Sequence, residues 1–136
     1  MLLPAKTKWR KSIKGRRRNC GVATSRTELA FGEYGLKSLG TIWLTAAQIE
    51  AARKAILHSL RKKGKVWFRI FPHKPVTAKS GEVPMGVGKG MVDYYVAPIK
   101  KGTILFELGG IEESVAREAF RLANHKLPVK TQFIKR

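Results

Sequence analysis

The chain has 136 residues, of which 43% are hydrophobic, 28 are Lys or Arg and only 9 are Asp or Glu. This length suits one domain with a buried core, and the composition excludes the disordered, collagen-like and disulfide-rich classes of protein. The formal net charge of +19 exceeds what solubility requires, so we expect a polyanionic partner.

The sequence gives no indication of a membrane span or of a disulfide framework. Its longest uncharged stretch, 38–49, is shorter than the roughly 18 apolar residues that a membrane-spanning helix needs. Cys20 is the single cysteine, so it cannot form an internal disulfide or supply a zinc cluster. We therefore expect an intracellular protein that does not cross a membrane.

Residues 1–27 form a basic N-terminal extension that contains no acidic residue and few large apolar side chains, Trp9 among them. Like charges repel and little apolar surface offsets the ordering entropy, so this segment should be disordered alone and become ordered against phosphates. An organellar transit peptide has a similar composition; we rank it second because Pro4, Gly15 and Gly21 interrupt a long amphipathic helix. The candidate phosphate-binding residues of the extension are Lys6, Lys8, Arg10, Lys11, Lys14, Arg16, Arg17 and Arg18.

The globular part is expected to span 28–136 as a single domain. Glycines punctuate the apolar residues of 29–44, which indicates short strands joined by turns. Thr45 and Gln48 then match a capping box, and helical periodicity follows over 49–63. We expect a basic cluster in the last turn of this helix, formed by Arg61, Lys62 and Lys63.

A strand and a long loop follow the first helix. Residues 65–71 alternate between an apolar face and a face that carries Trp67 and Arg69, which is typical of a half-buried strand. Prolines and glycines dominate 72–91, where we expect one extended loop. A loop of this length is usually functional or disordered.

The rest of the chain completes the fold. Strands are expected over 94–99 and 103–108, joined by a hairpin turn. A second helix begins near Glu112 and ends before Pro128, and 129–134 has the pattern of a closing strand. The predicted fold class is therefore α+β: an antiparallel or mixed sheet with two helices on one side, a basic N-terminal extension and a long Gly/Pro-rich loop.

The Gly-rich stretch 86–90 lacks the spacing of a nucleotide site. A P-loop needs a glycine where Val83 stands and a Ser or Thr where Gly90 stands, and a dinucleotide fingerprint needs a glycine at Met91. Two interpretations stay open, a flexible loop whose backbone lies against a phosphate backbone or an ordinary mobile hairpin. The loop residues concerned are Lys74, Lys79, Met85, Gly86, Gly88, Lys89 and Gly90.

No residue pattern points to catalysis. His58, His73 and His125 are scattered, without the spacing of a metal site or a catalytic triad. Several of the acids are explained by helix electrostatics, which leaves no carboxylate pair for acid–base work. We expect no enzyme activity, no cofactor and no metal site.

The basic residues are the informative signal. A solvated surface would account for a charge run such as 61–65, but uncompensated positive charge destabilises a fold unless a polyanion neutralises it. Trp9, Trp67, Tyr94 and Tyr95 could stack on unpaired bases, although packing is the commoner role of such rings. The candidate RNA-binding residues of the globular part are Arg53, Arg61, Lys62, Lys63, Lys65 and Arg69.

Six motifs occur in order along nearly the whole chain. They are Pro4 through Lys11, Phe31-Gly32 with Gly35-Leu36, Gln48 through Arg53, Gly64 through Pro72, Met85 through Gly90, and Ala116 through Pro128. Each motif is weak alone, but together they resemble the L-sixteen family of large-subunit ribosomal proteins in its bacterial form.

The resemblance implies a structural, RNA-binding component of the large ribosomal subunit with an α+β fold and no catalytic activity. In the family the protein lies beside the central protuberance and near the A-site tRNA, and it assists subunit maturation and the accommodation of aminoacyl-tRNA. The basic arm and the glycine-containing loop penetrate the rRNA, roles that would fall here to 6–18 and 79–90. The implied partners are large-subunit rRNA, A-site and P-site tRNA and neighbouring ribosomal proteins, without a membrane and without a second copy of the chain.

One position departs from the family pattern. Many bacterial relatives have an arginine directly before the Met-Gly-x-Gly-Lys-Gly stretch, whereas this chain has Pro84, so a contact or modification of that arginine does not transfer. The expected location is the ribosome of a bacterial cytoplasm, with an organellar ribosome as the alternative. Two other classes of function remain, an enzyme or regulator that binds a small phosphorylated ligand in the glycine loop, and a cationic membrane-surface protein.

Overall fold

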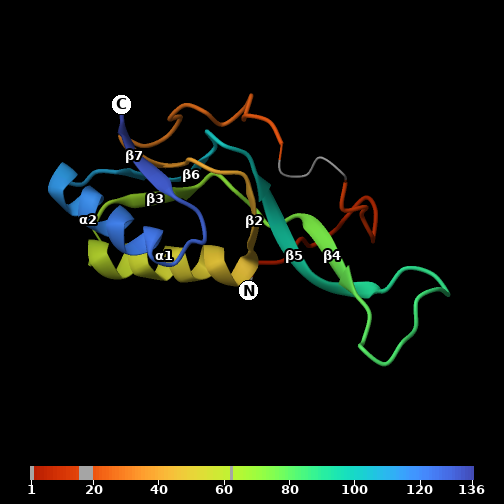
Figure 1. Cartoon of the computed structure of the whole chain (residues 1–136). Helices are drawn as coiled ribbons and strands as arrows, with labels where there is room; N and C mark the ends of the chain where they lie inside the picture. The colour runs from red at the N-terminus through yellow and green to blue at the C-terminus, as the bar shows by residue number, and fades with distance from the viewer. Residues whose placement is uncertain (1, 16–19, 62) are drawn as a thin grey trace.

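The computed structural model describes residues 2–15, 20–61 and 63–136, which combine two helices with two antiparallel sheets (Figure 1). This confirms the predicted α+β class. The strands follow the order β3-β6-β1-β7 in one sheet and β2-β5-β4 in the other, whereas the sequence predicts one sheet. The elements in chain order are β1 (Tyr34–Ser38), β2 (Ile42–Thr45), α1 (Ala46–Leu60), β3 (Lys65–Phe68), β4 (Lys74–Ala78), β5 (Met91–Ile99), β6 (Ile104–Gly109), α2 (Glu113–Asn124) and β7 (Thr131–Lys135).

Helix α1 begins at the cap that the sequence predicts. The backbone N–H of Thr45 donates to Oε1 of Gln48 at 3.0 Å, and the N–H of Gln48 donates to Oγ1 of Thr45 at 3.3 Å. These two bonds confirm the capping box, although the helix starts at Ala46, earlier than predicted. It ends at Leu60 because Arg61 adopts a left-handed conformation with φ 47°. The basic cluster expected in the last turn therefore begins just beyond the helix.

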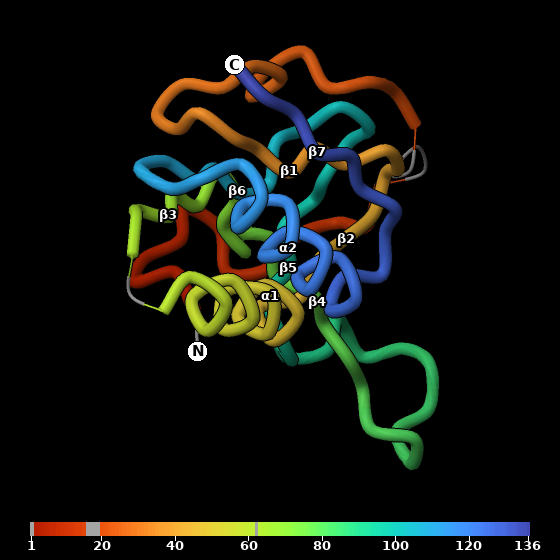
Figure 2. The backbone as a smooth tube through the Cα atoms, turned by 90° about the vertical axis from the view of Figure 1, so that its left-hand side faces the viewer, coloured from red at the N-terminus to blue at the C-terminus, as the bar shows by residue number. Residues whose placement is uncertain are grey.

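The two helices pack against each other on one side of the four-stranded sheet (Figures 1 and 2). Ile49 and Ile56 of α1 are fully buried, and Phe120 of α2 is 2% exposed. Phe120 also meets Phe133 of β7 edge to face, with 6.0 Å between the ring centroids. Each fully buried side chain of this size contributes about 1.5–3 kcal/mol, so this layer holds the body together.

The β4–β5 hairpin projects from the body, away from the helices (Figure 1). The sequence predicts one loop over 72–91, whereas β4 occupies Lys74–Ala78 and narrows the loop to 79–90. Strand β4 lies at the edge of its sheet, where Pro75 is tolerated although it has no N–H to donate. The pattern of a proline-containing edge strand is weak, which explains why sequence reasoning misses it.

Residues 26–33, which we call the strap, cross the face of the four-stranded sheet opposite to the helices (Figure 1). Gly32 approaches β6 so closely that an added Cβ would lie 2.5 Å from the carbonyl oxygen of Leu108. The N–H of Glu33 donates to that same oxygen at 2.9 Å. Glycine is required at position 32 because only a residue without a side chain lets the strap lie this close to the sheet.

Candidate nucleic-acid interface

Residues 2–15, which we call the arm, run beside the β4–β5 hairpin. Nζ of Lys11 donates to the carbonyl oxygen of Lys89 at 2.8 Å, and Nζ of Lys89 donates to the carbonyl oxygen of Ser12 at 2.6 Å. Each lysine thus holds the backbone of the other segment. The fold brings together the two segments that the sequence indicates separately as candidates for RNA binding.

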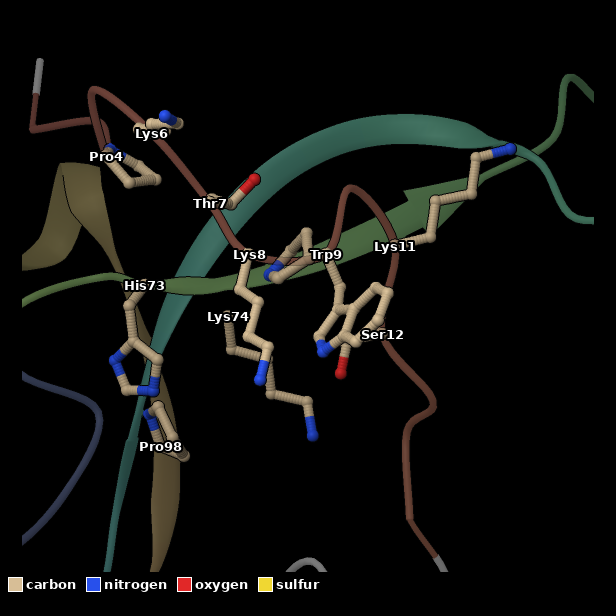
Figure 3. Close-up of a pocket in the computed structure, with 11 residues that line it drawn as sticks. Pro4, Lys6, Thr7, Lys8, Trp9, Lys11, Ser12, His73, Lys74 and Pro98 are labelled. Atoms are coloured by element: carbon tan, nitrogen blue, oxygen red, sulfur yellow. The ribbon is translucent and has the colours of Figure 1, made fainter.

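A groove of about 570 Å³ opens between the arm and β4 (Figure 3). The side chains of Lys8, Trp9, His73 and Lys74 extend in the same general direction in this view. Nζ of Lys74 lies 4.7 Å from the ring centroid of Trp43, a cation–π contact that orients the ammonium group. The described residues that line the groove include four lysines and no acid.

The charge distribution of this groove favours an anionic ligand. Ammonium groups without neighbouring carboxylates attract phosphate. Trp9 adds an aromatic ring that is 72% exposed, with Nζ of Lys8 at 5.6 Å from its centroid. Cations beside an exposed ring suit a nucleic acid, which offers phosphates and flat bases together.

The loop over 79–90 forms the tip of the hairpin. Nζ of Lys79 donates to the carbonyl oxygen of Gly86, and Met85 is 98% exposed. Gly86 and Gly88 adopt φ values of 117° and 88°, which glycine reaches without strain. The loop leads into strand β5 and not into a helix, so it lacks the helix N-terminus that phosphate-binding glycine loops use. This geometry gives no support to the small-ligand alternative.

Other predicted RNA-binding cations lie outside the groove. Nε of Arg53 donates to Oε2 of Glu50 at 2.9 Å, so this guanidinium has a partner on its own helix. Arg61, Lys63 and Lys65 are exposed near the end of α1 and the start of β3, without an ion pair to any described residue. In the arm, Arg10 is exposed, and the carbonyl oxygen of Lys14 accepts from Lys74 at 3.4 Å. Arg16, Arg17, Arg18 and Lys62 lie outside the described residues.

Arg69, a further candidate, is engaged inside the protein. Its Nη1 pairs with Oε1 of Glu107, and the two side chains are 14% and 0% exposed. The N–H groups of Phe31 and Gly32 donate to Oε2 of Glu107 at 2.7 and 2.8 Å, and that of Ala30 donates at 3.3 Å. Burial raises the pKa of this carboxyl, but the hydrogen bonds from Gly32, Phe31, Ala30 and Arg69 outweigh burial and hold the pKa below its ordinary value. We call this set of contacts the clamp, because it fastens the strap to the sheet.

Sequence reasoning misses Glu107. The residue stands within the otherwise apolar and buried strand β6. A carboxylate inside a buried strand needs a cation or several N–H donors, and this requirement is the signal that could have identified the clamp.

Within the described ranges, no group of His, Cys, Asp and Glu side chains could hold a metal ion, and no helix is long and apolar enough to span a membrane. What the chain offers is a packed α+β body from which a cationic arm and a hairpin extend together. These features define a basic protein of the nucleic-acid-binding class.

Comparison with known proteins identifies the family. The model of the family described as "Ribosomal protein L16p/L10e" matches residues 4–134, so the chain belongs to this family. It is 56% identical to the large ribosomal subunit protein uL16 of Sulfurihydrogenibium sp. (strain YO3AOP1), over 99% of this chain and 96% of that protein. It is 52% identical to the proteins of the same name from Trichodesmium erythraeum and Heliobacterium modesticaldum, over 100% of this chain and 98% and 93% of theirs. The resemblance of the six motifs is thereby confirmed.

Proposed function

We propose that this chain is a structural protein of the large ribosomal subunit that binds large-subunit rRNA through the arm and the β4–β5 hairpin. Membership of a ribosomal protein family supports a structural role without catalysis. The observation that carries the RNA-binding assignment is the acid-free groove, which the arm and hairpin form while Lys11 and Lys89 hold each other's segments.

The bonds that join the arm to the hairpin suit this role energetically. Both connect an ammonium group to an exposed backbone carbonyl. A hydrogen bond of this kind contributes only about 1 kcal/mol net, because water competes for both partners. An RNA phosphate can therefore replace the carbonyl of Lys89 or Ser12 with little loss, and the ammonium groups of Lys11 and Lys89 are already in position to meet it.

The proposed place within the subunit is beside the central protuberance and near the A-site tRNA, with the arm and the loop at 79–90 penetrating the rRNA. Neighbouring ribosomal proteins and the P-site tRNA are the further partners proposed. The protein would support late assembly of the subunit and the positioning of aminoacyl-tRNA. The named relatives are bacterial, which supports a location on ribosomes of the bacterial cytoplasm.

Salt dependence of binding to a fragment of large-subunit rRNA tests the proposal. With six to ten phosphates contacted, affinity should fall on the order of a thousandfold or more between about 50 and 200 mM salt. Replacing both Lys8 and Lys74 with alanine should reduce the slope of log affinity against log salt concentration by the equivalent of about two phosphate contacts. Lys135 and Arg121 supply a matched control, since both are ion-paired and their double alanine variant removes the same charge. Equal slope changes in the two variants, or affinity that ignores salt, would contradict the proposal.

A further inference from the structure

A second groove lies on the outer face of the strap and β3, apart from the residues that line the arm groove. Its volume is about 410 Å³, and its lining includes Phe31, Glu33, Lys65 and Trp67. Phe31 is 62% exposed, so one face of a large aromatic ring is open to solvent in this groove. The contacts proposed for the arm and hairpin leave this groove unexplained.

The ring of Phe31 is supported from beneath. It lies nearly parallel to the ring of Trp67, with 18° between the planes and 6.3 Å between the centroids. The guanidinium carbon of Arg69 lies 5.1 Å from the Phe31 centroid. Trp67 and Arg69 are two residues apart along an extended segment, so their side chains share one face of the sheet and Phe31 rests on both.

The clamp fixes this ring in place through the backbone. The N–H of Phe31 donates to Glu107 at 2.7 Å, and the N–H of Gly32 donates at 2.8 Å. These bonds fix the backbone of Phe31, and the contacts of its ring with Trp67 and Arg69 hold the side chain in its outward position. An aromatic ring that is exposed on one face and held on the other is preorganised for stacking, because little conformational freedom remains to be lost on binding.

We infer that this groove binds one unpaired RNA base, stacked on the exposed face of Phe31, an inference that rests on the proposed rRNA-binding function. Single-stranded RNA is commonly recognised by stacking of splayed-out bases on aromatic side chains. The exposed Lys65 lines the same groove and supplies a cation for the phosphate next to that base. The site is thus distinct from the phosphate-binding surface of the arm.

Glu33 gives the groove a preference among bases. It is exposed, lines the groove and has no ion pair with another described residue. An ionised carboxylate only accepts hydrogen bonds and repels phosphate, so it suits the edge of the base and not the backbone. Guanine presents two adjacent donors on its Watson–Crick edge, whereas adenine and cytosine present only an amino group there. Guanine is therefore the favoured base.

Two hairpin RNAs test this inference with the full-length chain. They are identical except for one extruded nucleotide, which is guanosine in the first and abasic in the second, so the phosphate charge is the same. Fluorescence anisotropy at one fixed salt concentration should show about tenfold tighter binding of the guanosine hairpin. Phe31→Leu should abolish this difference and Phe31→Trp should retain it. Phe71→Leu, at another exposed phenylalanine outside the groove, is the matched control and should leave the difference unchanged.

The Glu33→Gln variant tests base identity separately, through a hairpin with extruded adenosine. The preference of the wild-type chain for guanosine over adenosine should shrink severalfold, while the guanosine hairpin should still bind more tightly than the abasic one.

The outcomes separate this inference from the proposed function. If the wild-type chain binds the guanosine and abasic hairpins equally, or if Phe31→Leu keeps their difference, the stacking site is overturned while salt-dependent binding still supports the proposed function. If neither hairpin binds with any salt dependence, both fail. Circular dichroism melting checks the fold of each variant. Should Phe31→Leu unfold, the wild-type comparison and Phe31→Trp still decide the question.

Discussion

Replacing Glu107 with glutamine is the most direct test of the clamp. The carboxylate accepts from strap N–H groups on Oε2, and its Oε1 meets the guanidinium of Arg69. Glutamine keeps the size of the side chain but has only one acceptor oxygen. Its NH₂ group must face either the strap or Arg69, and either orientation sets donor against donor in a buried place.

The expected loss of unfolding free energy follows from the burial of the Arg69–Glu107 ion pair. Removing one partner of a buried ion pair costs about 3–5 kcal/mol. Arg69 retains 14% exposure and can recover some hydration, so we expect the lower end of that range, about 3 kcal/mol. For a domain of this size, such a loss lowers the Tm by roughly 10 °C.

Urea unfolding of Glu107→Gln, Arg69→Met and the double variant measures the coupling directly. Removing both charges leaves no unpaired guanidinium, so the double variant should lose less free energy of unfolding than the sum of the single variants, by about 1–3 kcal/mol. Losses that add to within about 0.5 kcal/mol would refute the clamp as an interacting pair.

Two further predictions concern the loss of stability at low pH and the N-terminal cap of helix α1. Because the pKa of Glu107 is lowered in the folded protein, its contribution to stability is fully present above the unfolded pKa and is lost as the pH falls through the folded value. Urea unfolding between about pH 6 and pH 3 should show a steeper loss for the wild-type chain than for Glu107→Gln, and parallel curves would contradict this. Thr45→Ala removes the acceptor of the Gln48 N–H and should cost about 1 kcal/mol in thermal unfolding. Thr45→Ser keeps an acceptor, so an equal loss from both variants would argue against the cap.

Local sequence patterns predict the helices well, because their determinants lie within one or two turns. The capping box at Thr45 and Gln48 and the buried stripe through Ile49 and Ile56 both appear in the structure. The second helix likewise begins beside Glu112. The residue that ends α1 is harder to predict. Helices often end at a glycine in the left-handed conformation, but here Arg61 adopts that conformation.

Strand pairing is predicted less well, because it joins residues that are distant in the sequence. The hairpin turn at 100–102 is expected, but its two strands enter different sheets. Arg69 and Glu107 are 38 positions apart, and Lys11 and Lys89 are 78 apart. No short-range pattern encodes such partners, so both the clamp and the meeting of arm and hairpin emerge only from the structure.

For the candidate interface too, the sequence predicts the local feature, its basic charge, but not the contacts between distant residues. Counting charges identifies the arm and the loop as basic, and the fold brings Lys11 and Lys89 together as a candidate site would require. The count does not reveal which cations are engaged within the protein. Arg53 and Arg69 both have carboxylate partners, Glu50 and Glu107, and only the structure identifies these pairs.

The connection between β5 and β6 joins the two sheets and is hydrogen-bonded to segments on both of its sides. The N–H of Gly102 donates to the carbonyl oxygen of Ser38 at 2.7 Å, and the N–H of Ser38 donates to the oxygen of Thr103 at 2.8 Å. On the other side, the N–H of Ala23 donates to the oxygen of Lys101 at 2.9 Å. A joint bonded on both flanks bends little, since hinges need free backbone torsions. Because β5 continues from the hairpin and β6 belongs to the four-stranded sheet, we expect these bonds to limit bending of the hairpin relative to that sheet.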